Sequence, residues 1–577
     1  MTHLYTVLHG GLVLTLDGAA PTDAASRALG SPDAAGRRAT AVAFADDRIL
    51  AVGSDDEVLP LAGPGSRVLD LGGRVVVPGF RDPHAHPLGE GLDAGKVLTG
   101  GEPDLRAGLR RLSDVASRLD PDAWLLARYD QTRWRDPRHP TRDDLDRAIP
   151  DRPVLLAHVS GHAVAANSLA LALARVGPAT EDVAGRWSVE RDVHGEPTGI
   201  VTGTEAASLF ADAVPAPTAS DLAAAVARDA ERLAAHGVVA TADADFGSDG
   251  IGVERASRAY VAAAEAGRLH QSVSLMPGLA RLGPPDAAPP APADISGGIP
   301  VDLRDRLPVR ACKLKADGAM TTRTAWLRED FADAPGWRGL MVEDAGALRV
   351  RVAGAHAAGW QVCTHAIGDA AVDAICDALE ALGTADPVTG AGGGTEGRAS
   401  TAAAARRHRI EHAMLLDDVT IERIARLGAT LSMQPEFVAW AGDTYRARLG
   451  DARVARMNRY RSVLAAGIPV AFGSDRPVVG GAPLDGILAA VRHEGPSGRP
   501  LDAGERLSAA EALHAWTVGA ARAMWAEADA GRIAVGMRAD LVVLSTDPTD
   551  PAAWDRGSAP AVAATVIGGR LVHGDLG

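Results

Sequence analysis

Short apolar runs separated by turn residues occupy the first 75 residues of the chain, and this pattern predicts β-strands. Residues 41–45 and 48–53 flank an Asp-Asp turn and are typical of a hairpin. The end of the chain repeats the pattern at residues 540–544 and 563–572. Because the two ends of a chain often lie close together, we expect these terminal strands to pair into one small β-sandwich.

Between the two ends, apolar strand-like runs alternate with Ala-rich helical stretches such as residues 222–235 and 421–427. This alternation is typical of an α/β protein with a parallel sheet. Eight strands are expected, at residues 74–80, 237–241, 271–275, 309–314, 361–365, 408–412, 429–433 and 469–473. Since eight parallel strands close a (β/α)8 barrel, the pattern predicts a TIM barrel.

The crossover after the first barrel strand is far too long for one helix and predicts an inserted subdomain at about residues 87–233. The expected division is therefore residues 1–76 for the first part of the sandwich, 77–529 for the barrel with its insertion, and 530–577 for the second part. Two stretches rich in Pro, Ala or Gly, at residues 284–300 and 383–407, are expected to be loops or disordered.

Composition excludes several classes of protein. The net charge of −15 argues against nucleic acid and anionic lipid as partners. The three cysteines, at positions 312, 363 and 376, show neither the spacing of a disulfide framework nor that of a cysteine zinc site. Neither a signal peptide nor an apolar run of about 18 residues is visible, so we expect a cytoplasmic enzyme that acts on a small molecule.

Two histidines, His84 and His86, follow the first predicted barrel strand. A His-x-His pair alone is weak evidence in a chain with 17 histidines, because chance alone produces such pairs. On an extended strand, however, residues i and i+2 point the same way, here toward the carboxyl end of the barrel, where active sites lie. Neutral imidazole is a natural ligand of zinc, so the pair predicts a metal site; the alternative is a solvated turn.

Three further candidates stand at the ends of other predicted strands. His365, His412 and Asp475 each follow an apolar run by a residue or two and should project into the barrel mouth. A single histidine in such a place is more often a hydrogen-bonded structural residue. Four histidines and one aspartate at corresponding strand ends instead favour a shared metal site.

Lysine is rare in this chain: only Lys96, Lys313 and Lys315 occur among 59 Lys and Arg residues. Two of the three lie in one apolar strand. A buried lysine readily loses its proton, and the neutral amine can react with carbon dioxide to give a carbamate that bridges two cations. The alternative is an ordinary ion pair, for instance with Asp317, and spacing does not choose between Lys313 and Lys315.

As an ordered set, these residues resemble the amidohydrolase superfamily, and in particular its amidohydrolase 3 branch, which includes N-substituted formamide deformylases. The resemblance covers nearly the whole chain. It is carried by Pro78-Gly79-Phe80…Asp82…His84…His86, Gly161-His162…Asn167-Ser168, Lys313…Asp317-Gly318…Arg323, His365-Ala366-Ile367-Gly368-Asp369, Arg409-Ile410-Glu411-His412 and Gly473-Ser474-Asp475.

The resemblance implies a deformed (β/α)8 barrel, a composite β-sandwich from both termini, and one or two divalent cations, usually zinc. It implies that His84 and His86 hold one cation with Asp475, and that His365 and His412 hold the other. The family lysine stands four residues before Asp-Gly, which selects Lys313, in its N6-carboxylated form, as the bridging ligand. Family members are often homodimers.

The implied activity is hydrolysis of a C–N bond other than a peptide bond, in an amide or formamide. A metal-activated hydroxide attacks the carbonyl, and Asp475 passes the proton to the leaving amine. His162 is expected to hold the oxyanion or the substrate, and the alternative is a structural histidine. Asp317 and Arg323 are expected as further substrate contacts, and Asp82 and Glu411 are expected to orient ligands. The alternatives are a cyclic amide, carbamate or ester as substrate, or a metal-binding barrel without activity.

Three places depart from the family pattern: Arg81, the segment Met320-Thr321-Thr322, and Arg476. None of them is an expected metal ligand. They leave the substrate unassigned.

Overall fold

The computed structural model describes residues 5–18, 36–94, 96–99, 101–120, 123–131, 134–159, 163–183, 186–203, 206–248, 250–284, 287–383, 401–554 and 559–576. Among these residues, no helix combines the length and the apolarity needed to cross a membrane. The chain divides into two compact units. The first comprises Met1–Pro87, Asp229–Ser248 and Gly252–Gly577, and the second comprises Leu88–Arg228 and Asp249–Ile251.

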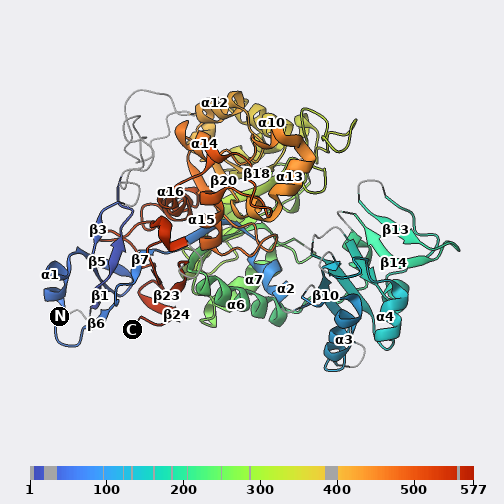
Figure 1. Ribbon diagram of the computed structural model, residues 1–577, viewed down its shortest axis with the longest axis horizontal. Coiled ribbons are helices and arrows are strands. Elements are labelled where there is room, and N and C mark those ends of the chain that lie inside the picture. The colour runs from blue at the N-terminus through green and yellow to red at the C-terminus, as the bar shows by residue number, and fades with distance from the viewer. Residues whose placement is uncertain are drawn as a thin grey trace. The chain divides into compact units, whose positions relative to one another are not determined.

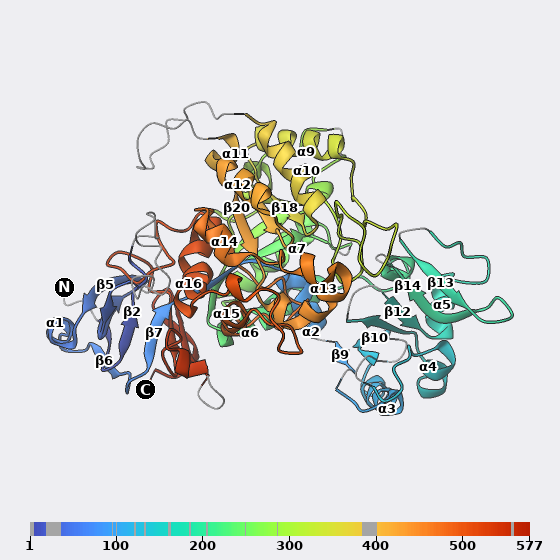
Figure 2. The same cartoon turned by 45° about the horizontal axis from the view of Figure 1, so that its top comes forward.

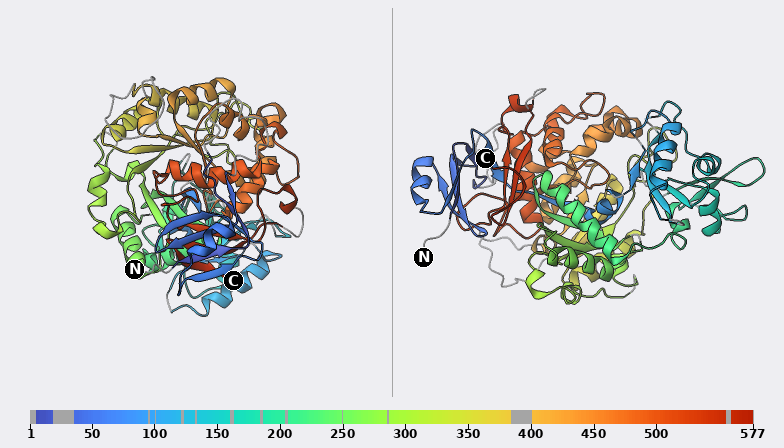
Figure 3. Two further views of the ribbon diagram at one scale, coloured as in Figure 1. Left: turned by 90° about the vertical axis from the view of Figure 1, so that its left-hand side faces the viewer. Right: turned by 90° about the horizontal axis from the view of Figure 1, so that it is seen from below.

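Eight parallel strands form the centre of the first unit, surrounded by helices (Figure 3, left). They lie in the sheets β16-β15-β8 and β17-β18-β19-β20-β21, which a bridge between Gly278 and Lys313 connects. This is a TIM-barrel-like α/β fold. The strands are β8 (Phe80–Ala85), β15 (Val238–Phe246), β16 (Ser272–Pro277), β17 (Ala311–Lys315), β18 (Gln361–Ala366), β19 (Arg409–His412), β20 (Thr430–Met433) and β21 (Val470–Phe472).

The helices of the first unit follow from local signals that α12 (Asp418–Leu427) illustrates. The Asp417 side chain accepts the Thr420 N–H at its start, and Gly428 ends it in the left-handed conformation. Ile421, Ile424 and Leu427 recur at helical spacing and are buried. The other helices include α6 (Ala219–Ala235), α7 (Val253–Glu265), α9 (Ala345–Ala357), α10 (Asp369–Glu380), α13 (Glu436–Val454), α14 (Tyr460–Ala465), α15 (Pro483–Arg492) and α16 (Ala509–His514).

The first barrel strand differs from the prediction. Residues 74–80 were expected to form it, but β7 (Val75–Pro78) belongs to another sheet, where it pairs with β2 and β22. The chain changes sheets at Gly79: its N–H donates to Asp540 O, whereas the next N–H, of Phe80, donates to Gly237 O. A Cβ at position 79 would lie 2.4 Å from the Val239 side chain, so only glycine fits this close crossing.

Strands from both ends of the chain form the sheets beside the barrel (Figure 1, blue and red). Strands β1 (Thr6–His9), β4 (Ala41–Ala45), β5 (Arg48–Gly53) and β6 (Arg67–Asp70) have the order β5-β4-β1-β6. The order of the other sheet is β24-β23-β22-β7-β2-β3, with β2 (Leu12–Leu14), β3 (Arg38–Ala39), β22 (Leu541–Leu544), β23 (Val562–Ile567) and β24 (Arg570–Gly574). A shared apolar core, including Val13, Phe44, Val76 and Val543, holds them together.

Arg81 connects the barrel to this core by a buried ion pair. Its Nη2 lies 3.1 Å from Asp540 Oδ2, and both side chains are almost fully buried. The unusual arginine is therefore matched by an acid 459 residues away in the chain. The attraction between the two charges offsets the cost of removing each of them from water. The arginine at position 81, which departs from the family pattern, therefore has a structural explanation.

The second unit contains one mixed sheet with helices on both faces (Figure 2). Its strand order is β13-β14-β12-β11-β10-β9. Helices α3 (Leu105–Ala116) and α4 (Arg142–Ala148) share one apolar core with β10 and β11, while α5 (Ser168–Leu173) shares another with β12 and β14. The strands are β9 (Val97–Leu98), β10 (Leu125–Tyr129), β11 (Val154–His158), β12 (Ala163–Ala166), β13 (Ser188–Arg191) and β14 (Pro197–Thr202).

The two expected loop regions are only partly described. Residues 284–300, without 285–286, contain the short helix α8 (Pro292–Ser296). Of residues 383–407, the stretch 384–400 lies outside the described residues, and α11 (Ala402–Ala405) follows it.

A buried histidine before β19 links stability to pH. The Val362 N–H donates to His408 Nδ1 at 2.9 Å, so the proton of His408 is on Nε2, 2.9 Å from His356 Nδ1. Burial, followed by the charge of His356, lowers the pKa of His408 from 6.5 to about 3. The folded protein therefore holds His408 neutral in a range where the unfolded chain protonates it.

We expect His408 to make the protein less stable as the pH falls. Its contribution is present above pH 6.5 and is lost toward pH 3, with a slope that approaches about 1.4 kcal/mol per pH unit. The measurement is the free energy of unfolding in urea at pH 7.5 and 5.5 for the parent and His408→Gln. The difference between the free energies of unfolding of the two proteins should be smaller at pH 5.5 than at pH 7.5. If this difference is the same at both pH values, His408 is not held neutral in the folded protein.

Candidate metal centre

His84, in β8, is fixed by a buried charge network. Its Nδ1 hydrogen-bonds Glu411 Oε2, so Nδ1 carries the proton and Nε2 presents a lone pair. Arg409 donates to both oxygens of Glu411, at 2.7 and 2.8 Å, and to Pro83 O at 2.8 Å. Although burial opposes it, Arg409 and then His84 hold the pKa of Glu411 well below its usual range. Glu411 is thus an anion that fixes the orientation of the His84 ring.

His412, at the end of β19, has a similar arrangement with a neutral partner. Its Nδ1 lies 2.7 Å from Gln434 Oε1 and donates a hydrogen bond to this oxygen. The opposite atom, Nε2, is buried and has no hydrogen-bond partner in the described part of the chain. His412 adopts a left-handed φ of 71°, which is uncommon for this residue type and turns the side chain at the strand end.

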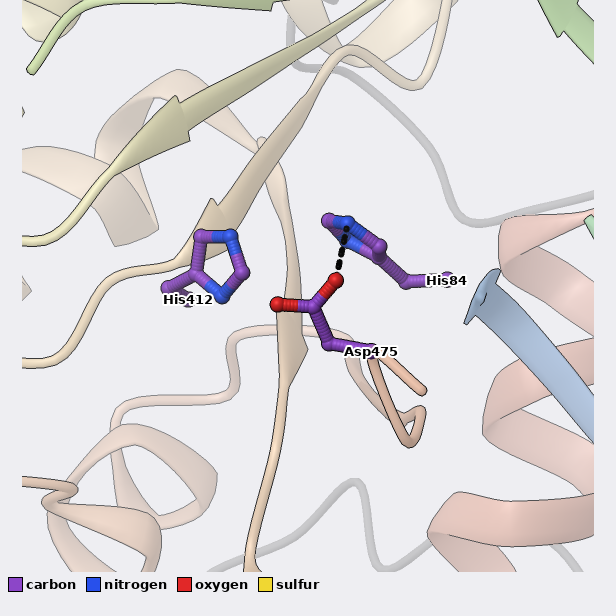
Figure 4. A group of neighbouring side chains, drawn as sticks. All are labelled: His84, His412 and Asp475. Carbon is purple, nitrogen blue, oxygen red and sulfur yellow. Dashed lines mark ion pairs between the residues drawn. The ribbon is translucent and has the colours of Figure 1, made fainter. Parts of the chain in front are cut away.

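Asp475 meets these two imidazoles (Figure 4). One ligand atom from each of His84, His412 and Asp475 lies within 4.8 Å of the others, and all three residues are buried. His84 Nε2 is 3.4 Å from Asp475 Oδ1. Although burial opposes it, the neighbouring histidines hold the pKa of Asp475 well below its usual range, so the carboxylate is charged.

The other predicted ligands contact this group. His86 Nε2 lies 2.9 Å from Asp475 Oδ1, and Lys313 Nζ lies 2.7 Å from His84 Nε2. The rings of His365 and His412 are 4.4 Å apart between centroids. The structure therefore brings all six predicted metal ligands into one connected cluster.

The donor set fits a divalent cation. His86 Nδ1 donates to Ala244 O at 2.6 Å, so the neutral His86 ring has its lone pair on Nε2, as the rings of His84 and His412 do. His86 Nε2 lies 2.9 Å from a carboxylate oxygen of Asp475, and although burial opposes it, this carboxylate raises the pKa of His86. A divalent cation between the two atoms would take the place of that proton. Neutral imidazoles and a carboxylate are ligands that zinc and similar ions take.

The segment that carries Asp475 is anchored on both sides. The Asp475 N–H donates to His84 O at 2.7 Å, and Arg476 O accepts the His86 N–H at 3.0 Å. Asp82 accepts hydrogen bonds from the N–H groups of His84 and Ser474, both at 3.1 Å, and from the Ser474 hydroxyl. Asp82 thus holds the backbone of two strand ends, and its role in orienting metal ligands stays a prediction.

Arg476 is the second departure that the structure explains. Its guanidinium forms an ion pair with Asp229, and both side chains are 1% exposed. A buried arginine with a matched acid is a structural element of the loop after Asp475. It does not require a contact with substrate.

Comparison with known proteins decides the family. The family model described as "Amidohydrolase family" (Amidohydro_3) matches residues 67–573. The chain belongs to this amidohydrolase family.

Relatives of this amidohydrolase span nearly its whole length. The putative amidohydrolase YtcJ of Bacillus subtilis is 32% identical over 93% of this chain and 96% of its own. N-substituted formamide deformylase of Arthrobacter pascens is 30% identical over 90% and 92%. An uncharacterized metal-dependent hydrolase from Pyrococcus furiosus has a similar solved structure, with a TM-score of 0.71 and 26% identity over 95% of this chain and 100% of its own. These likenesses agree with the resemblance seen in the sequence.

Of the three residues predicted to bind substrate, the structure describes Asp317 and Arg323. His162 lies outside the described residues. Asp317 accepts the N–H groups of Ile367, Gly368 and Trp326, at 2.8 to 3.0 Å, although its Oδ1 is also 3.5 Å from His365 Nε2. Arg323 makes a two-point ion pair with Asp333. For Asp317 and Arg323 these contacts are structural, and substrate binding by the three residues stays a prediction.

Sequence reasoning missed two residues that orient the ligands. Arg409 and Gln434 hold Glu411 and His412, respectively. Arg409 belongs to the segment Arg409-Ile410-Glu411-His412, which carries the family resemblance, and Gln434 directly follows the predicted strand at residues 429–433. Their places beside a predicted ligand and at the end of the next strand were the available signal.

Proposed function

We propose that this protein is a metal-dependent hydrolase that cleaves the C–N bond of an amide or formamide in a small molecule. The observation that carries the proposal is the convergence of His84, His412 and Asp475 at the ends of barrel strands. The likeness to an N-substituted formamide deformylase supports the choice of bond.

The residues that would hold metal follow from the cluster. His84, His86 and Asp475 would hold one cation, and His365 and His412 a second. Lys313, carboxylated on Nζ, would bridge them. Zinc is the expected metal. A divalent cation bound there supplies a Lewis acid and lowers the pKa of its water from about 15.7 toward 7.

Lys313 has the environment that carboxylation needs. It is buried, and burial lowers the pKa of its ammonium group. The neutral amine attacks carbon dioxide, an N–C bond forms, and one proton is released to leave the carbamate anion. The carbamate would replace the Nζ contact to His84 with oxygen ligands.

Asp475 is the proposed proton carrier. Its carboxylate is charged and lies against His84 and His86, so it can accept the proton of the attacking water. The protonated acid then donates to the nitrogen of the leaving amine as the C–N bond breaks. Once the proton has passed to the amine, Asp475 is again a charged carboxylate.

A substrate panel with metal removal tests the proposal. We expect turnover of formamides or linear amides, loss of at least 90% of it after treatment with a chelator, and recovery with Zn²⁺. Lactams, hydantoins, carbamates and aryl esters in the same panel test the second candidate, a different bond cleaved on the same site. Full metal content without turnover of any compound would mean that the barrel binds metal without catalysing hydrolysis.

A further inference from the structure

Three charged side chains form a triad at the carboxyl ends of β15, β16 and β17. Lys315 Nζ lies 3.0 Å from Asp245 Oδ2. Arg281, in the short helix η5 (Leu279–Arg281), reaches the same carboxylate with Nε at 3.3 Å and Nη2 at 3.4 Å. The Asp245 side chain is only 13% exposed, whereas that of Lys315 is 52% exposed. The triad has two positive charges and one negative charge.

The backbone is shaped around this triad. Asp245 adopts a left-handed φ of 59°, which is uncommon for a residue other than glycine. Gly278, which follows β16, leaves the space that the carboxylate fills, because a Cβ there would lie 2.1 Å from Asp245 Oδ1. The Asp245 carboxylate is thus positioned to hold the side chains of both Lys315 and Arg281. The triad is therefore more than a chance contact between surface side chains.

The triad lies beside the candidate metal centre. Lys315 pairs in register with His365 and follows Lys313 by two residues on the same face of β17, about 7 Å further along the strand. Asp245 directly follows Ala244, whose carbonyl fixes His86.

The excess positive charge is suited to an anion. An ammonium group has three N–H donors, and Asp245 is the acceptor that the described part of the chain offers to Lys315. Charge-assisted hydrogen bonds from lysine and arginine are the usual way in which proteins hold a carboxylate. A purely structural ion triad would not need this half-exposed lysine at the mouth of the barrel.

We propose that Lys315 and Arg281, held by Asp245, bind an anionic group of the substrate. The substrate would then be an amide or formamide with a carboxylate or similar anion a few bonds from the scissile C–N bond. This inference rests on the proposed function for its substrate class, but binding of the anion can be measured without turnover.

Binding of a pair of matched probes tests the inference on the metal-loaded enzyme. 2-Phenylethanesulfonate carries an anion that is a weak metal ligand, and 2-phenylethanol is its neutral counterpart. By calorimetry, we expect the parent to prefer the sulfonate, and Lys315→Met and Arg281→Met each to weaken its binding about 10-fold or more. Lys315→Arg should keep most of the affinity. Lys96→Met removes the same charge at an ion pair with Asp93 and should change nothing.

Asp245→Asn separates binding from a structural role. It removes the negative charge with little change of shape, so it should tighten sulfonate binding several-fold. A merely structural triad predicts lower thermal stability and no gain in affinity. Because this variant acts in the opposite direction, it keeps the inference testable even if Lys315→Met does not fold.

Turnover gives a second measurement. N-Formylphenylalanine and N-formylphenethylamine differ only in the carboxylate, and Lys315→Met should raise KM about 10-fold for the first and less than 2-fold for the second. If the parent binds sulfonate and alcohol equally, or the variants keep the preference, the inference is wrong even though amides are hydrolysed. Sulfonate binding that depends on Lys315, without turnover of any amide, would support the anion site and contradict the proposed function.

Discussion

Asp475→Asn should lower kcat by about 10³-fold, within the range that general acid–base catalysis contributes. The carboxamide has nearly the same shape and keeps an oxygen toward His84 and His86, but it cannot accept the proton of the attacking water. We therefore expect the variant to keep its metal. The measurements are kcat on the best compound of the panel and metal content by mass spectrometry.

The matched control is Asp418→Asn. Asp418 is 83% exposed and pairs with Arg459 at the surface, so this change should leave kcat within a factor of two. Hydrolysis by Asp475→Asn at the parental rate would make the proton-carrier role wrong. Loss of both metal and activity would mean that the charged carboxylate of Asp475 is needed to keep the cation bound.

Lys313→Ala should lose one metal equivalent per chain and nearly all activity. A bridging carbamate contributes one ligand to each cation, and alanine supplies none. Lys315→Ala should keep the parental metal content, because the Lys315 side chain is directed to Asp245 and not to His84. Metal content after dialysis, measured side by side on the three proteins, checks this prediction.

The comparison is sensitive because the two lysines stand two residues apart in one strand. Equal metal content in the parent and Lys313→Ala would mean that Lys313 does not bridge. A carbamate adds the three atoms of carbon dioxide to the Lys313 side chain. A crystal structure at neutral pH with carbonate present would show these atoms and so provides an independent test.

That the candidate ligands lie close together could be predicted from the sequence, because a barrel converts order along the chain into position in space. Each candidate followed an apolar run, and parallel strands bring their carboxyl ends to one side. The choice between Lys313 and Lys315 could not be made from alternation, since both side chains leave the strand on the same face. Burial separates them: Lys313 contacts His84, and Lys315 is half-exposed beside Asp245.

The departures from the family pattern could not be interpreted from the sequence alone. The partners of Arg81 and Arg476 lie 459 and 247 residues away. No local periodicity connects such positions, although both arginines are buried and paired. The first predicted barrel strand was also misplaced, because apolar residues stand on both sides of Gly79. Only the tertiary contacts of Gly79 show where one sheet ends and the other begins.

The pairing of β7 with β22 has a consequence for the chain while it is being synthesised on the ribosome. Val77 lies next to Val542, so one edge of β7 stays open until the last segment has been synthesised. At synthesis rates of about 5–20 residues per second, roughly 25 to 90 seconds separate the two strands. During that interval Arg81 lacks Asp540. The nascent protein must therefore protect an apolar strand edge that, left exposed, invites pairing with other chains.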